Sequence, residues 1–198
     1  PLDESSDFNK LLCNDRIEHI IKTIDEYGCD SSDARGLVFC SRIEEANELS
    51  QAFNLRGFKT LPITGSDNED VREQAIRRLE SSSDDKLDYL FTVDVFNEGV
   101  DIPQVNQVVM LRPTSSAIIF VQQLGRGLRK APGKDYLTVI DFIGNYQNNY
   151  LIPIALFGDS SYNKDRLRRL LSAGSSLIPG ASSISFEKIA KERVFSSI

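Results

Sequence analysis

The sequence predicts an α/β fold: a parallel sheet with helices on both faces, followed by a mostly helical C-terminal extension. Short apolar runs alternate along the chain with longer segments whose apolar residues recur at helical spacing. Strands that alternate with helices in this way form parallel sheets with right-handed crossovers. After about residue 144 the alternation stops, and asparagines, serines and a basic segment follow.

The predicted strands are short, and most of their residues are apolar. This is typical of strands that are buried on both faces of a sheet. We expect them at Gly36–Cys40, Thr60–Thr64, Leu87–Val93, Val105–Leu111 and Tyr136–Ile143.

A first helix is expected from Asp15 to about Tyr27, with Asn14 as its N-cap and Gly28 as its stop. Its apolar face consists of Ile17, Ile20, Ile21 and Ile24. The other expected helices are Ile43 to about Arg56, Asp70–Leu79, Ser115 to about Arg129, Asn163–Leu171 and Phe186–Phe195. In the first two of these, the inward residues would be Ala46, Leu49, Ala52, Phe53, Val71, Ala75, Ile76 and Leu79.

These elements divide the chain into an N-terminal helix and linker (1–33), an α/β domain (34–144) and an accessory extension (145–198). Residues 1–33 carry nine acidic and three basic side chains. The whole chain has 29 acidic and 23 basic side chains, so residues 34–198 have 20 of each and no net charge. Two basic clusters stand out in this neutral part: Arg126, Arg129, Lys130 and Lys134, and then Lys164, Arg166, Arg168 and Arg169.

Composition excludes several classes of protein. Three cysteines and one histidine do not make a disulfide framework or a zinc site, and no metal site is expected. No apolar run approaches the roughly 20 residues that span a bilayer. Free thiols and the absence of a signal peptide predict a cytoplasmic protein. The chain begins with Pro1 and not Met, so we expect a piece of a longer protein.

Known phosphate-binding loops are also missing. The one Gly-Lys pair, Gly133-Lys134, is followed by Asp135, and Leu128 stands where a P-loop needs its first glycine. The pair Gly125-x-Gly127 lacks the third glycine of a dinucleotide loop. The chain is therefore not expected to hold a nucleotide by itself.

Ligands of parallel sheets bind beyond the carboxyl ends of the strands. The residues just past those ends should share one edge: Ser41-Arg42, Thr64-Gly65, Asp94 to Asp101, Arg112 and Asp141. We therefore look for a binding site at this edge.

The segment from Gln122 to Arg129 reads QQLGRGLR. Arg126 and Arg129 are neighbours on a helix, and two guanidiniums held together favour an anion such as phosphate between them. Gly125 and Gly127 each cost a helix up to about 1 kcal/mol relative to alanine, which a close approach of a ligand or backbone would offset. A solvated basic helix end is the alternative.

A second segment, from Thr92 to Pro103, begins at the end of a predicted strand and contains a hydroxyl, three carboxylates and a glycine. Its carboxylates could accept a ribose hydroxyl or hold an arginine. The alternative is a turn capped by Asp101 before Pro103.

In order and spacing, these motifs resemble the second motor domain of superfamily 2 helicases, which has a RecA-like fold. Arg35–Arg42 is similar to motif IV, and Ile63-Thr64-Gly65 with Arg72 is similar to the turn and helix that follow. Thr92–Pro103 is similar to motif V, and Gln122-x-x-Gly125-Arg126-x-x-Arg129 matches the motif VI pattern QxxGRxxR. The resemblance covers about residues 34–144.

Two departures point to one branch of the superfamily. Gln122 stands where RNA helicases of the DEAD type carry histidine, and Thr64 stands where many relatives have histidine before glycine. The resemblance is therefore closer to the DNA-directed, type III restriction-like branch. The tail from residue 145 is similar to that of bacterial helicases fused to a phospholipase-D-like nuclease.

The resemblance implies a role for each matching residue. Arg126 and Arg129 would be arginine fingers on the γ-phosphate of ATP, which a first motor domain holds with Mg²⁺, and Gln122 would sense the nucleotide or the attacking water. Gly99 and Asp101 would lie at the nucleotide cleft. The DNA backbone would be held without base reading by Ser41, Arg42, Thr64, Gly65 and Thr92.

The chain alone should then bind ATP weakly and not hydrolyse it. The partners implied are DNA, the first motor domain and a nuclease domain of the same polypeptide. A non-catalytic motor-like module that binds nucleic acid or a protein remains an alternative, and so does a free-standing flavodoxin-like domain. The presence of both Arg126 and Arg129 argues against the non-catalytic module. The absence of a glycine in Cys40-Ser41-Arg42-Ile43, the first candidate for a phosphate loop after a strand, argues against the flavodoxin-like domain.

Overall fold

The computed structural model describes residues 4–95, 102–112, 131–142, 163–173 and 192. The chain divides into two compact units, residues 1–111 with 126–141 and residues 112–125 with 142–198. The first unit contains all described strands, and the second contains helix α6 (Lys164–Ala173). The division predicted from the sequence, at residues 33 and 144, stays a prediction.

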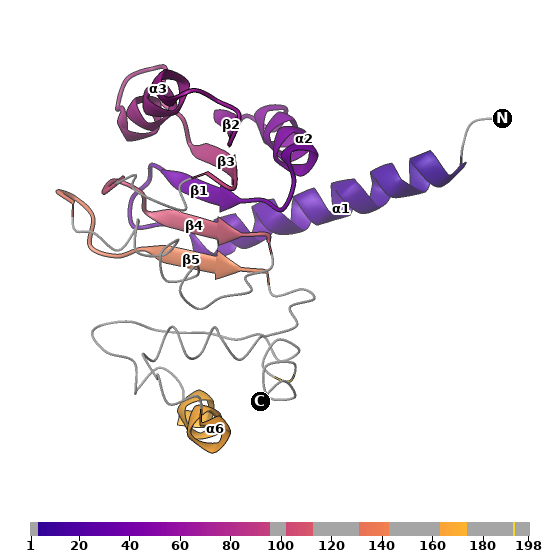
Figure 1. Cartoon of the computed structure of the whole chain (residues 1–198), viewed down its shortest axis with the longest axis vertical. Coiled ribbons are helices and arrows are strands. Elements are labelled where there is room, and N and C mark those ends of the chain that lie inside the picture. The colour runs from indigo at the N-terminus through magenta and orange to yellow at the C-terminus, as the bar shows by residue number, and fades with distance from the viewer. Residues whose placement is uncertain (1–3, 96–101, 113–130, 143–162, 174–191, 193–198) are drawn as a thin grey trace. The chain divides into compact units, whose positions relative to one another are not determined.

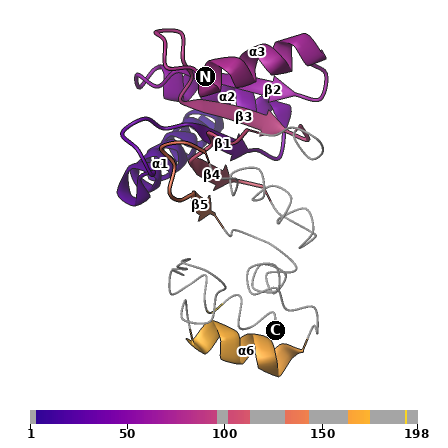
Figure 2. The same ribbon diagram turned by 90° about the vertical axis from the view of Figure 1, so that its left-hand side faces the viewer.

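The first unit is built on a five-stranded parallel sheet, which confirms the predicted fold class. The order of the strands is β2-β3-β1-β4-β5, as both Figure 1 and Figure 2 show. Each predicted strand is present, within two residues of its expected bounds: β1 (Gly36–Phe39), β2 (Thr60–Thr64), β3 (Tyr89–Val93), β4 (Gln107–Met110) and β5 (Thr138–Asp141).

Burial along the strands follows their place in the sheet. Every residue of the inner strands β3, β1 and β4 is buried. The outer strands are less covered: Leu61 and Pro62 of β2 are half-buried, and Val139 of β5 is exposed. Pro62 is tolerated because β2 is the outermost described strand on its side of the sheet, and no other described strand pairs with its outer side.

Helices cover both faces of the sheet. Helices α1 (Glu4–Tyr27) and α2 (Ile43–Asn54) share one face, where Arg56 just past α2 pairs with Glu18 at 2.7 Å and Arg16 pairs with Glu45. Helix α3 (Glu69–Glu80) lies on the other face, because the crossovers through α2 and α3 run in opposite directions across the sheet. Figure 1 shows α2 and α3 on either side of β2 and β3.

The structure corrects two details of the helices. Helix α1 begins at Glu4, so Asn14 lies inside it and the predicted N-cap is wrong. Between Glu4 and Asn14 there is no glycine or proline to end a helix, which is why it continues. In α3, Ala75 and Leu79 are buried as predicted, but Val71 is exposed because it lies in the first turn. The predicted helices 115–129 and 186–195 lie outside the described residues, apart from Glu192.

The carboxyl end of α1 is fixed to the sheet by a buried amide. Ile17, Ile20 and Ile24 are buried as predicted. The Gln107 side chain accepts a hydrogen bond from the Tyr89 hydroxyl at 2.7 Å and donates to the carbonyl of Gly28 at 2.8 Å. Burial raises the pKa of the Tyr89 phenol, which favours the protonated hydroxyl that donates this bond.

Gly36 is the point of closest packing inside the sheet. It lies in register with both Tyr89 and Gln107. A Cβ atom at this position would come within 2.2 Å of two ring carbons of Tyr89, which is itself fully buried. The glycine is therefore required by the ring that crosses it.

We predict that Gly36→Ala destabilises the domain, because the ring of Tyr89 has to shift within a packed core. Overpacking of this kind typically costs about 1–3 kcal/mol. The free energy of unfolding in urea measures this cost. Gly65→Ala is the matched control, since a Cβ there meets nothing within 4 Å. Equal stability of the two variants would show that the ring of Tyr89 does not constrain β1.

Candidate functional site

The carboxyl ends of all five strands meet at one edge of the sheet. Thr64 pairs with Val93, Phe39 pairs with Thr92 and Met110, and Met110 pairs with Asp141. The segments that follow β1, β2 and β3 therefore leave the sheet side by side. This confirms the prediction of a shared edge for its described members.

Ser41 and Arg42 form the link between β1 and α2. Both are exposed. The amide of Ser41 donates to the Glu45 carboxylate at 2.8 Å, and Arg16 of α1 pairs with the other oxygen of that carboxylate. Arg42 is the N-cap residue of α2 in an extended conformation and makes no side-chain capping bond. The backbone here is held by Glu45, which leaves the Ser41 hydroxyl and the Arg42 guanidinium at the surface.

Thr64 and Gly65 begin a tight turn after β2 that closes on one carboxylate. Oδ2 of Asp67 accepts from the Thr64 amide at 2.7 Å and from the Thr64 hydroxyl at 3.0 Å. The Thr64 hydroxyl also lies 2.7 Å from that of Ser66. Thr64 is only 8% exposed, so its side chain shapes the turn more than it faces solvent.

Arg72 of α3 supports this turn from the other side. Its guanidinium donates to the carbonyl of Gly65 at 2.7 Å. Helix α3 is itself oriented by Asn68, whose side chain accepts from the amide of Val71 at 2.9 Å. Gly65 is exposed, so its backbone is presented at the edge in a fixed position.

Thr92 does not share that exposure. It is fully buried in β3, and its hydroxyl lies 3.4 Å from the carbonyl of Val38 in the neighbouring strand. Of the five residues predicted to contact a nucleic-acid backbone, three therefore lie at the surface, namely Ser41, Arg42 and Gly65. Their contacts, and those of Thr64 and Thr92, stay predictions.

Asp94 lies at this edge as predicted, but its backbone conformation is a feature that the sequence did not reveal. It directly follows β3 and is exposed, and its φ of 52° is the one positive value among the described residues other than glycine. Aspartate tolerates this left-handed conformation better than most residues. This left-handed conformation changes the direction of the chain near the start of the segment that resembles motif V. Residues with strained backbone conformations are frequent at functional sites.

The residues predicted to meet the nucleotide lie outside the described part of the chain. They are Gln122, Arg126, Arg129, Gly99 and Asp101. Within the described residues, no three His, Cys, Asp or Glu side chains gather closely enough to hold a metal ion. The described elements also include no helix that is both long and apolar enough to cross a membrane.

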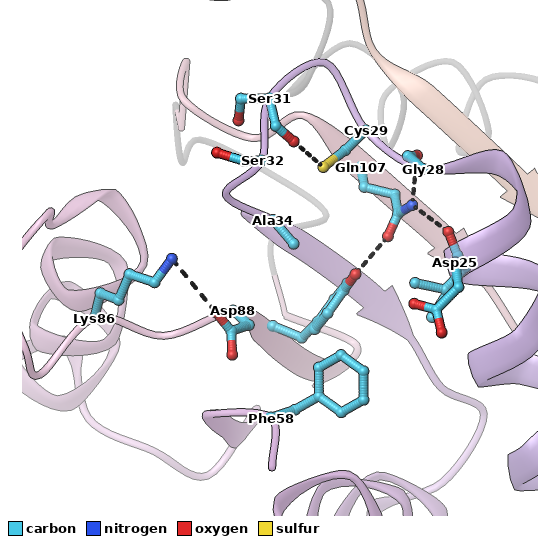
Figure 3. Close-up of a pocket in the computed structure, with 12 residues that line it drawn as sticks. Asp25, Gly28, Cys29, Ser31, Ser32, Ala34, Phe58, Lys86, Asp88 and Gln107 are labelled. Carbon is cyan, nitrogen blue, oxygen red and sulfur yellow. Dashed lines mark hydrogen bonds and ion pairs between the residues drawn. The ribbon is translucent and has the colours of Figure 1, made fainter. Parts of the chain in front are cut away.

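A pocket of about 440 Å³ opens at the opposite, amino edge of the sheet (Figure 3). Several of its polar side chains bond to neighbouring groups of the protein. Lys86 pairs with Asp33 at 2.9 Å and with Asp88 at 3.6 Å, and Gln107 bonds Tyr89 and Gly28. Lys86 also holds the pKa of Asp33 below its usual range. These contacts tie loops together, so the pocket is a weaker candidate than the carboxyl edge.

The chain belongs to the helicase conserved C-terminal domain family, whose model matches residues 15–131. It is 31% identical over 160 residues to the ATP-dependent RNA helicase SrmB of Haemophilus influenzae, covering 81% of this chain and 34% of that protein. It is 27% identical over 150 residues to the type I restriction enzyme EcoKI endonuclease subunit of Escherichia coli, covering 70% of this chain and 12% of that protein. The chain thus spans about a third of the first relative and about an eighth of the second.

Solved structures support the same fold. The yeast DEAD-box splicing factor Prp28 matches 91% of this chain and 34% of its own at a TM-score of 0.60, with 18% identity. Escherichia coli DEAD-box protein SrmB, bound to the regulator of ribonuclease activity A, matches 86% of this chain and 90% of its own at 0.55, with 19% identity. The RecA-like architecture is therefore confirmed, while the type III restriction-like branch stays a prediction.

We predict that Asp67→Ala opens the turn after β2, because the Thr64 amide and hydroxyl lose their shared acceptor. The loss of such bonds costs about 1–3 kcal/mol of unfolding free energy. Hydrogen exchange at the Thr64 amide should also become faster. The control is Asp84→Ala, which removes an exposed carboxylate from the loop after α3. Unchanged exchange at Thr64 would contradict the role given to Asp67.

Proposed function

We propose that the chain is the second motor domain of an ATP-dependent helicase or translocase that acts on DNA. The observation that carries this proposal is the carboxyl edge of the sheet. There Ser41, Arg42 and Gly65 are exposed together in a domain of the helicase family.

The chemistry of this edge suits the backbone of a nucleic acid. A hydroxyl, a guanidinium and a glycine backbone can each hydrogen-bond a phosphate oxygen, and none of them reads a base. Glu45, Asp67 and Arg72 hold the surrounding backbone, so the ligand would not have to order it. We therefore expect binding that is independent of sequence and sensitive to salt.

DNA is proposed over RNA because Gln122 and Thr64 depart from the histidines of RNA helicases of the DEAD type. One of the relatives named above is a restriction enzyme subunit, which supports this choice, whereas SrmB is named as an RNA helicase. A phospholipase-D-like nuclease in the same polypeptide is proposed as a further partner, because the tail from residue 145 is similar to that of bacterial helicases fused to such a nuclease.

ATP hydrolysis would need a first motor domain that holds ATP and Mg²⁺. In this proposal Arg126 and Arg129 reach the γ-phosphate, Gln122 senses the nucleotide, and Gly99 and Asp101 line the cleft. Arginine fingers of this kind are worth about 10³–10⁵ in rate in well-studied GTPases. Because the sequence has no P-loop, the chain alone would bind ATP weakly and not hydrolyse it.

We predict that Arg42→Gln weakens binding of the chain to single-stranded DNA and lowers the salt slope by about 0.7, since one phosphate contact to a single strand is lost. Fluorescence anisotropy at several salt concentrations, with DNA and RNA of equal length, measures both the contact and the preference. Arg77→Gln, an equally charged change at an exposed position of α3, is the control. Tighter binding of RNA would contradict the proposed substrate, and an unchanged salt slope for Arg42→Gln would contradict the proposed interface.

We predict that Arg126→Ala or Arg129→Ala, in the protein with both motor domains, abolishes DNA-stimulated ATP hydrolysis and leaves most DNA binding intact. A finger acts on the transition state, so turnover should fall far more than nucleotide affinity. Arg→Lys should not rescue either position, because an ammonium lacks the planar fork. Turnover within about twofold of the unaltered protein would show instead a solvated basic helix end.

A further inference from the structure

Helix α6 differs in charge from the other described helices. Its ten residues contain four basic side chains and one acidic side chain, a net charge of +3. Counting the residues of each segment, α1 and α2 each carry a net charge of −3, and α3 carries −1. A concentrated positive charge on one short helix, in a chain with a net charge of −6, calls for an explanation.

The charged side chains of α6 are all at the surface. Lys164, Arg166, Arg168 and Arg169 are exposed, whereas Leu167 is only 1% exposed. At 100° per residue the charged residues occupy one arc of the helix and Leu167 lies outside it. The helix begins where Asn163 accepts a hydrogen bond from the amide of Arg166 at 3.0 Å. The arc is therefore a defined surface on a capped and anchored helix.

The acidic residue on this arc does not neutralise it. Asp165 lies 3.6 Å from the Arg168 guanidinium, in an exposed pair three residues apart. Its backbone carbonyl accepts from Nε of Arg169 at 3.4 Å. Exposed pairs of this kind contribute at most about 1 kcal/mol and are screened by salt. Two arginines beside one carboxylate leave a positive surface.

We propose that this arc of α6 binds the phosphate backbone of a nucleic acid, as a second contact separate from the carboxyl edge of the sheet. The four cations lie within about 7.5 Å along the axis, so they can reach adjacent phosphates of one strand. Three of them are arginines, whose planar forks suit phosphate oxygens. That the ligand is a nucleic acid rests on the proposed function, whereas the positive surface of α6 is observed independently of that function.

The composition of the arc favours a nucleic acid over a protein partner. Among the α6 residues whose side chains the structure describes, the exposed ones are Lys164, Asp165, Arg166, Arg168, Arg169 and Ser172, and none of these is apolar. The centres of protein interfaces are depleted of charge and are built on aromatic or aliphatic anchors. Contacts to nucleic-acid phosphates need no such anchor.

The test compares two double variants of the whole chain. Arg168→Gln with Arg169→Gln removes two cations from α6 and keeps a good helix former. Lys22→Gln with Arg77→Gln removes two exposed cations from α1 and α3. Anisotropy with a single-stranded oligonucleotide is measured over a range of salt concentrations, and melting temperatures verify folding.

The α6 variant should lower the salt slope by about 1.4, since each contact to a single strand contributes about 0.7, and the control should not change it. A slope equal to that of the unaltered chain, an equal loss in the control, or no binding by the unaltered chain would each overturn the proposal. Displacement of the oligonucleotide by poly-L-glutamate at equal charge would indicate an acidic protein ligand and would also overturn it.

Arg42→Gln, measured in parallel, separates this inference from the proposed function. Loss of contacts only in Arg42→Gln would overturn the role of α6 and leave the carboxyl edge standing. Loss of contacts only in the α6 variant would overturn the carboxyl edge as the binding surface and leave the role of α6 standing.

Discussion

The pairing of β1 between β3 and β4 is the constraint on which the rest of the domain depends. All four residues of β1 are buried, and Gly36 leaves the space that the Tyr89 ring fills. That ring in turn donates its hydroxyl to Gln107, which holds the end of α1. Because β2 and β1 both pair in parallel with β3, the same sheet brings Ser41, Asp94 and the turn at Gly65 to one edge.

The two edges of the sheet use their polar groups differently. At the amino edge the groups bond to each other: Asn106 accepts from the amide of Arg35 at 2.9 Å and donates to the carbonyl of Asp33 at 2.8 Å, while Lys86 pairs with two carboxylates. At the carboxyl edge the internal bonds are made by Glu45, Asp67 and Arg72, and neighbouring groups remain exposed. This contrast is why we place the nucleic acid at the carboxyl edge.

Much of this architecture could be predicted from the sequence, because buried parallel strands are nearly continuous apolar runs between helical segments. The shared edge followed from strand direction alone. The conformation of Asp94 could not be predicted, since a positive φ at aspartate leaves no pattern in neighbouring residues. Nor could the burial of Thr92, because a strand-end hydroxyl is equally compatible with an exposed contact. The start of α1 was missed because Asn14 suits a helix interior less than a cap, yet nothing before it breaks the helix.

The central claim is that the carboxyl edge of the sheet is the surface that meets the nucleic acid. Titration of the isotope-labelled chain with a short single-stranded oligonucleotide, followed by NMR of the backbone amides, tests it residue by residue. The account predicts shift changes at Ser41, Arg42 and Gly65 and none around Cys29–Asp33 at the amino edge. Changes confined to the amino edge would contradict it.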